Sequence, residues 1–134
     1  MSVYLLDTNI CIYIIRRNSE RVIERLIQKR ISDVAISSIT LSELEYGVAK
    51  SAKPKQNALA LAEFLAPLLV IPYDEIAAHR YGHIRAELEK RGAPIGSLDM
   101  LIAAHALALQ TILVTNNESE FNRVPGLRVE NWTV

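Results

Sequence analysis

The sequence predicts an α/β fold in which helices cover both faces of a central parallel sheet. Two observations lead to this prediction. Short apolar runs of strand length alternate with helical segments along the whole chain. These runs are apolar throughout, which is typical of strands buried on both faces of a parallel sheet. At 134 residues, the chain is expected to form one domain, residues 1–134.

The first strand is expected at residues 3–6, where four apolar side chains stand together. Ile10, Tyr13 and Ile14 then recur at helical spacing, which predicts a helix at residues 9–16. The strand and the helix are therefore joined by only a few polar residues.

The later elements are predicted in the same way, from apolar runs, helical spacing, and acidic starts and basic or glycine ends of helices. Ser97 is the expected N-cap of the last long helix. In chain order the elements are a helix at 19–30, a strand at 33–38, helices at 39–51 and 55–68, a strand at 68–73, helices at 74–92 and 97–110, a strand at 111–115, a loop or short helix at 116–124 and a strand at 127–132.

Composition narrows the class of protein. Half of the residues are hydrophobic and 22% are charged, which favours a compact fold over disorder. The formal net charge is zero, which argues against broad, nonspecific nucleic-acid binding but leaves room for a local basic groove. The single cysteine, Cys11, excludes an internal disulfide and is expected in the core. No leader or membrane-spanning stretch is recognisable, so a cytoplasmic protein without membrane contact is expected.

Acidic residues stand where such a sheet binds ligands, beyond the carboxyl ends of its strands. Asp7 follows the first strand, Glu43 and Asp99 lie early in helices, and Glu120 follows the strand at 111–115. Each has a plain structural reading: Asp7 as a helix cap, Asp99 as a charge favoured at a helix start, and the glutamates as solvated surface. Because Glu43 and Glu45 are two apart on a helix, at most one of them is expected to point inward.

Taken together, the three acids Asp7, Glu43 and Asp99 predict a metal site. Like charges gathered in one cleft cost stability unless a cation offsets them. Carboxylate oxygens without a Cys or His set suit Mg²⁺ or Mn²⁺, and such ions activate water and stabilise charge on a phosphate.

Four motifs, in this order, resemble those of the PIN-domain ribonucleases, and specifically of the VapC toxins of bacterial type II toxin–antitoxin pairs. They are "LLDTNICIYII", "ITLSELEYG", "PIGSLDMLIAAHAL" and "LVTNNESEF". The resemblance implies a three-layer α/β/α sandwich and a Mg²⁺- or Mn²⁺-dependent endoribonuclease that cleaves structured RNA, typically tRNA. It implies that Asp7, Glu43 and Asp99 hold the metal ion. At the place of the family's fourth acid stands Asn117, with Glu120 nearby, so either residue is a candidate for a fourth position.

The resemblance also implies supporting residues and partners. Thr115 and Asn9 would orient the metal ligands or water. A VapB-type antitoxin would bind the protein and block its cleft, and a homodimer, or a heterotetramer or larger assembly with the antitoxin, is expected. An apolar groove among the early helices would suit such partners. Phe64 lies in the apolar run at 61–71, which is expected in the core, with a partner surface as the alternative. Basic residues would guide RNA at the rim of the cleft, and the candidates are Arg16, Arg17, Lys50, Lys53, Lys55 and Arg85.

Other readings are weaker. His79 and His83 are one helical turn apart, but the zinc-protease pattern needs a Glu after the first His, where Arg80 stands. His105 is expected to be a buried helix residue with one hydrogen bond. A receiver domain or a haloacid-dehalogenase-type phosphatase would need further acids near Asp7 or a Lys after a late strand. The remaining alternative is a PIN-fold RNA- or protein-binding module with little or no catalytic activity.

Overall fold

The computed structural model describes residues 2–134 and contains the predicted parallel sheet. The spatial order of its strands is β3-β2-β1-β4-β5, and every neighbouring pair is parallel. The strands are β1 (Tyr4–Leu6), β2 (Val34–Ser37), β3 (Leu69–Ile71), β4 (Ile112–Val114) and β5 (Val129–Glu130).

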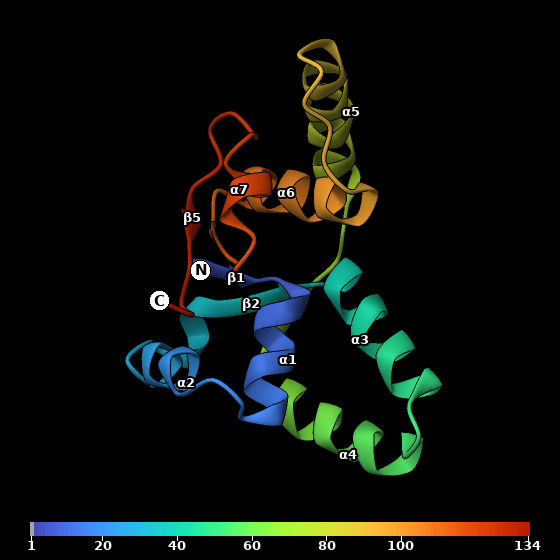
Figure 1. Ribbon diagram of the computed structural model, residues 1–134, viewed down its shortest axis with the longest axis vertical. Helices are drawn as coiled ribbons and strands as arrows, with labels where there is room; N and C mark the ends of the chain where they lie inside the picture. The colour runs from blue at the N-terminus through green and yellow to red at the C-terminus, as the bar shows by residue number, and fades with distance from the viewer. Residues whose placement is uncertain (1) are drawn as a thin grey trace.

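Helices cover both faces of this sheet, as predicted. In Figure 1 the sheet crosses the middle of the molecule, with α5, α6 and α7 above it and α1, α2 and α4 below it. The helices are α1 (Thr8–Arg16), α2 (Glu20–Ile27), α3 (Ser38–Lys50), α4 (Pro54–Leu65), α5 (Glu75–Lys90), α6 (Ser97–Leu109) and α7 (Glu118–Phe121), with a 3-10 turn at Ile31–Asp33. The three-layer α/β/α sandwich is therefore confirmed.

The two faces of the sheet form two separate cores because successive strand residues point to opposite sides. Leu5, Ala35 and Leu113 pack with residues of α5 and α6 in one cluster. The other cluster, against α1 and its neighbours, takes the adjacent strand residues Leu6, Ile36 and Val114. Every strand position buried on both sides needs an apolar residue, which explains the unbroken apolar runs.

Several element boundaries differ from those predicted. The strands are shorter than the apolar runs that predict them, and Leu69 of the edge strand β3 is 58% exposed. Ser97 does not cap α6: Gly96 takes the N-cap position without a side-chain cap, and Ser97 is the first helical residue. Within residues 2–134, no helix is long and apolar enough to cross a membrane.

The strand order turns at β1, and this point positions the functional site. After β1 the chain adds β2 and β3 on one side, and it then returns to place β4 on the other side of β1. Ligands of open α/β sheets bind beyond the carboxyl ends of the strands at such a point. The residues that follow β1 and β4 there are Asp7 and Thr115.

Candidate active site

Asp7 directly follows β1, at the point where the strand order turns, and it is 6% exposed. Its carboxylate accepts a 2.9 Å hydrogen bond from the backbone N–H of Ile10, so it caps α1 as the capping interpretation predicts. Burial raises the pKa of Asp7 from 3.8 to about 6, and the negative charge of Glu43 adds to the increase. A hydrogen bond with the Thr115 side chain opposes it. Asp7 is therefore both a cap and a member of a carboxylate group.

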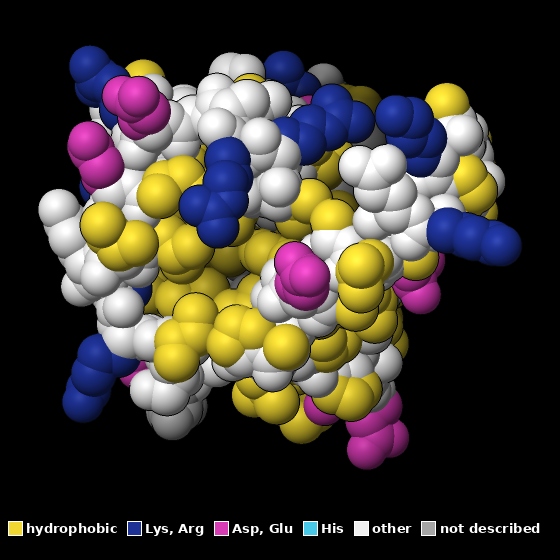
Figure 2. All heavy atoms as spheres, turned by 90° about the horizontal axis from the view of Figure 1, so that it is seen from below, with side chains coloured by type: hydrophobic (Ala, Val, Ile, Leu, Met, Phe, Trp, Pro, Cys, Tyr) yellow, Lys and Arg dark blue, Asp and Glu magenta, His cyan; other side chains and the backbone are white. Residues whose placement is uncertain are grey.

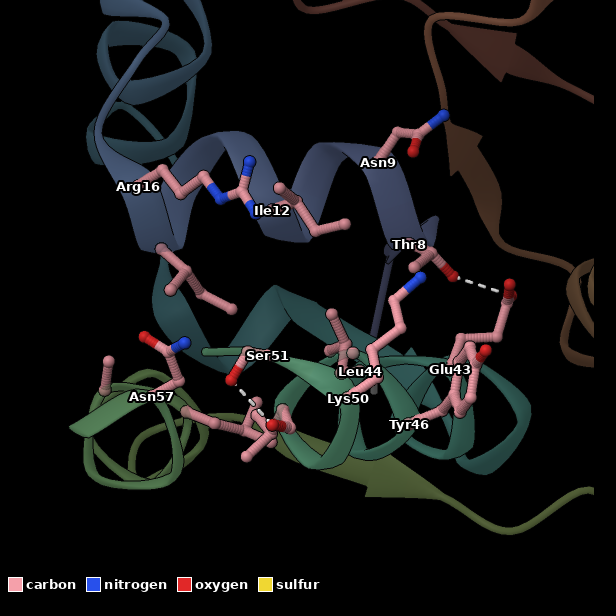
Figure 3. A pocket seen from close by; sticks show the side chains of 15 residues that line it. Thr8, Asn9, Ile12, Arg16, Glu43, Leu44, Tyr46, Lys50, Ser51 and Asn57 are labelled. Atoms are coloured by element: carbon pink, nitrogen blue, oxygen red, sulfur yellow. Dashed lines mark hydrogen bonds between the residues drawn. The ribbon is translucent and has the colours of Figure 1, made fainter. Parts of the chain in front are cut away.

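Glu43 on α3 is connected to this carboxylate group by a hydrogen bond from Thr8, the first residue of α1. Its Oε1 accepts a 2.8 Å hydrogen bond from Thr8 Oγ1, drawn as a dashed line in Figure 3. Glu45, two residues further along α3, is exposed to solvent. The expectation that at most one of these two glutamates points inward is confirmed.

Asp99 in the first turn of α6 lies against Glu120 of α7. Burial first, then the charge and hydrogen bond of Glu120, raise the pKa of Asp99 from 3.8 to about 7. The more distant charges of Asp7 and Glu43 raise it further. Three other carboxylates therefore act on Asp99, although they come from three different segments of the chain.

Gly96 lies where Asp99 and Glu120 meet. Its backbone N–H donates a hydrogen bond to Glu120, which lowers the pKa of that carboxyl. A Cβ atom at position 96 would stand 3.5 Å from an oxygen of Asp99 and 3.5 Å from one of Glu120. The contacts at the start of α6 thus favour the ionised form of Glu120, while the pKa of Asp99 is raised.

Asn117 and Glu120 make different contacts in this site. Glu120 interacts with Asp99 directly, whereas Asn117 Nδ2 donates a hydrogen bond to Glu120. The backbone N–H of Asn117 donates a 3.0 Å hydrogen bond to Thr115 Oγ1. Asn117 therefore links Thr115, which bonds to Asp7, with Glu120 on the other side of the site. Asn9 contributes its backbone N–H to Asp7.

The donor set fits a hard divalent cation. The group offers carboxylate oxygens without a thiol or an imidazole, which suits Mg²⁺ or Mn²⁺. Burial is the main cause of the raised pKa values of Asp7 and Asp99, and neighbouring negative charges add to it; a bound cation would offset both effects. Across the described residues, no group of three or more His, Cys, Asp or Glu side chains is close enough to coordinate one ion directly.

A cavity of about 450 Å³ adjoins the carboxylates between α1, α3 and α4. It shares Thr8, Asn9 and Glu43 with the site and does not include Asp7, Asp99 or Glu120. Figure 3 shows its walls, with Arg16 and Ile12 on α1, Tyr46 and Lys50 on α3, and Asn57 on α4.

The basic residues proposed for RNA guidance differ in whether they line this cavity. Arg16 and Lys50 line this cavity, whereas Arg17, Lys53 and Lys55 are exposed residues outside its lining. Arg85 lies on α5, which stands away from α1 and α3 in Figure 1, and its guanidinium donates to Tyr81 Oη and to Glu89. The fold therefore brings two of the six residues together beside the acids.

Sequence reasoning missed Thr8 and Gly96. Thr8 directly follows Asp7, so a hydroxyl next to a candidate ligand was the available signal for it. Gly96 carried no comparable signal, because its role depends on Glu120, 24 residues later in the chain.

The histidines lie as expected. His79 and His83 are exposed on α5, with ring centroids 4.5 Å apart. His105 is buried, and its Nδ1 lies 2.8 Å from Ser37 Oγ. None of the three belongs to the carboxylate group.

Comparison with known proteins identifies the class. Residues 4–127 match the family model of the PIN domain. The chain is 46% identical to Ribonuclease VapC2 of Rickettsia felis over 131 residues, covering 97% of this chain and 98% of the relative. It is 45% identical to the tRNA(fMet)-specific endonuclease VapC of Salmonella typhimurium, covering 96% and 97% of the two chains.

Solved structures agree with this comparison. The fold matches a chain of the DNA-bound VapBC structure of Salmonella typhimurium with a TM-score of 0.93, at 45% identity and with 98% and 99% of the two chains covered. It matches a chain of the Rickettsia felis VapBC2 structure bound to a promoter DNA fragment with a TM-score of 0.91, at 45% identity and with 97% and 98% covered. The fold and its acidic site thus define a PIN-domain protein. Within that class, the chain belongs to the VapC ribonucleases, the toxins of VapBC pairs, as its four motifs predict.

Proposed function

We propose that this protein is a Mg²⁺- or Mn²⁺-dependent endoribonuclease, that tRNA is its substrate, and that a VapB-type antitoxin inhibits it. The observation that supports this proposal is the electrostatic coupling of Asp7, Glu43 and Glu120 to Asp99 at the turn of the strand order. The VapC of Salmonella typhimurium is named a tRNA(fMet)-specific endonuclease, which favours tRNA over other structured RNA.

Each side chain has a stated part in this activity. Asp7, Glu43 and Asp99 would hold the cation directly or through water, and Glu120 would supply the fourth carboxylate. Thr8 fixes the rotamer of Glu43, Thr115 fixes that of Asp7, and Asn117 fixes that of Glu120. When bound, the cation supplies the Lewis acidity that activates the attacking water and stabilises charge on the scissile phosphate.

The protonation of the buried carboxylates also determines whether the site can bind a cation. Because Asp7 and Asp99 have raised pKa values, about 6 and about 7, both must lose protons before they can bind a cation well. Asp7 needs no movement to do so, since the Ile10 N–H and the Thr115 side chain already stabilise its ionised form.

The partner surface that we propose lies between α1, α2 and α4, below the sheet in Figure 1. Figure 2, seen from below, shows a hollow lined by hydrophobic side chains and bordered by Lys and Arg. A cavity of about 200 Å³ on this side is almost entirely apolar, and its lining includes Ile14, Leu26 and Phe64 from α1, α2 and α4. Its apolar lining between α1, α2 and α4 supports its assignment as the apolar groove expected for a partner.

Cleavage assays test the activity. Purified protein, free of antitoxin, is incubated with unfractionated tRNA in Mg²⁺, in Mn²⁺ and in EDTA. Discrete fragments that require metal and disappear in Glu43→Gln, but persist in the matched control Glu45→Gln, would support the proposal. Absence of cleavage by folded wild-type protein would favour the binding-module alternative.

A further inference from the structure

The cavity between α1, α3 and α4 is next to the carboxylates but is not part of them. It shares Thr8 and Glu43 with the site, and its floor contains the buried side chains of Leu44 and Leu61. At about 450 Å³ it lies within the usual size range of small-ligand sites. A group held there would therefore stand beside whatever the acids act on.

Tyr46 gives this cavity an exposed aromatic wall. The side chain is 64% exposed, although it is large and apolar, and it lies one helical turn after Glu43 on α3. Nucleobases stack on such rings because every base has a π face. Unpaired bases of structured RNA, which can leave their own stack, are the usual targets of this kind of recognition.

Two cations stand on opposite walls of the same cavity. Lys50 Nζ lies 4.8 Å from the centroid of the Tyr46 ring, and Arg16 faces it from α1. Within residues 2–134, neither side chain has an acidic partner within 4.0 Å. Unpaired cations beside an exposed ring favour an anionic aromatic ligand and repel a basic one.

We propose, resting on the proposed ribonuclease function, that this cavity binds one unpaired nucleotide of the RNA substrate. Its base stacks on Tyr46, and its phosphate contacts Lys50 and Arg16, so that the neighbouring phosphodiester lies over the carboxylates. The alternative occupant is a segment of the antitoxin. The cavity lined by Phe64 suits a protein segment better, because its lining is almost entirely apolar.

Binding assays with non-cleaving protein test this subsite. In the Asp99→Asn background, affinity for fluorescein-labelled single-stranded RNA and for tRNA is measured over a range of salt concentrations. Tyr46→Ala is expected to weaken binding about 5- to 100-fold without changing the salt dependence. Tyr46→Phe, which keeps the ring, is expected to bind as the unmodified background does.

Substitution of Lys50 separates charge from stacking. The slope of log affinity against log salt concentration is negative, and Lys50→Gln is expected to make it shallower by about 0.7. This is the change for loss of one phosphate contact on single-stranded RNA. Lys90→Gln removes an exposed lysine at the end of α5, outside the cavity, and is expected to leave the affinity for single-stranded RNA unchanged.

Gly47→Leu provides a variant that fills the cavity without disturbing the fold. A Cβ at this lining position meets no atom within 4 Å, and replacing a glycine inside α3 favours the helix. It is expected to weaken RNA binding as Tyr46→Ala does, while the thermal midpoint stays equal or rises.

The outcomes distinguish this inference from the proposed function. If wild-type protein cleaves tRNA but Tyr46→Ala and Gly47→Leu bind RNA normally, the subsite is wrong and the ribonuclease function stands. If these variants lose affinity for a VapB-type antitoxin while RNA affinity is kept, the cavity belongs to the partner and the inference is overturned. If wild-type protein neither binds nor cleaves RNA, both proposals fail.

Discussion

Thr8 at the start of α1 donates a 2.8 Å hydrogen bond to the carboxylate of Glu43 on α3. The two residues are 35 positions apart, and Thr8 directly follows the buried Asp7. The hydrogen bond therefore joins the residues after β1 to the helix after β2 and fixes the rotamer of one candidate metal ligand next to another.

This contact predicts that Thr8 is a positioning residue. Thr8→Val keeps the shape of the side chain but removes the hydroxyl, so Glu43 loses its fixed orientation. We expect tRNA cleavage at limiting Mn²⁺ to fall about 10- to 100-fold, the usual cost of losing a group that orients a metal ligand. Saturating Mn²⁺ should recover most of the loss, and Thr8→Ser should behave as wild type. An equal loss at all Mn²⁺ concentrations would contradict a role in metal binding.

The buried carboxylate of Asp7 predicts a cost in stability without metal. Its pKa rises from 3.8 to about 6 on folding, so the folded state binds protons more tightly than the unfolded state. The free energy of unfolding should therefore fall as pH rises from about 4 to about 6 and then stay lower, by at most about 3 kcal/mol for two pKa units.

Asp7→Asn tests this cost. The amide oxygen can still accept the hydrogen bond from the Ile10 N–H, so α1 keeps its cap. Urea unfolding in EDTA at about pH 8 should show a variant more stable than wild type, and the difference should vanish near pH 4. Glu45→Gln, which removes an exposed acid, is the control. A variant less stable than wild type at pH 8 would contradict the assignment of Asp7 as a strained, buried charge.

The raised pKa values also predict how metal binding depends on pH. Near pH 5.5, Asp7 with a pKa of about 6 and Asp99 with a pKa of about 7 hold protons that a cation must displace. Calorimetric Mn²⁺ affinity should therefore be weaker at about pH 5.5 than at about pH 8, on the order of 100-fold. The thermal midpoint should rise with Mn²⁺ mainly at the higher pH. An affinity independent of pH would mean that the ion binds elsewhere.

Glu120 should control the protonation of Asp99. After burial, its charge and hydrogen bond are the largest causes of the raised pKa of Asp99. In Glu120→Gln, the acidic limb of the pH–rate profile should move to lower pH, and the maximal rate should fall because a carboxylate is lost. Asn117→Ala, which removes only the hydrogen bond to Glu120, should move the limb less. If the acidic limb of the pH–rate profile does not move in Glu120→Gln, that limb reports the titration of a group other than Asp99.

Much of this fold could be predicted from local pattern, because strands buried on both faces must be apolar at every position. Leu5 and Leu6 are adjacent in sequence and belong to opposite cores. The ends of the elements were less predictable: Ser97 is a good capping residue, yet Gly96 takes the cap position, and its N–H donates to Glu120. That contact depends on how α7 packs, which the local sequence does not encode.

The same distinction holds for the site. Asp7, Glu43 and Asp99 could be selected because each follows a predicted strand or begins a helix on the ligand side of the sheet. The contacts of Asn117 and Glu120 depend on how the four-residue helix α7 is oriented against α6. The local sequence does not determine that orientation. The cavity beside the acids depends on the distances between α1, α3 and α4, so Tyr46 attracts attention only in the folded molecule.

The most direct test of the central claim is to measure Mn²⁺ binding and tRNA cleavage in parallel, in wild type, Glu43→Gln and Glu45→Gln. If the carboxylates at the turn of the strand order form one metal site, Glu43→Gln loses both properties together, while Glu45→Gln keeps both. Full cleavage by Glu43→Gln, or cleavage by wild-type protein in EDTA, would contradict the claim.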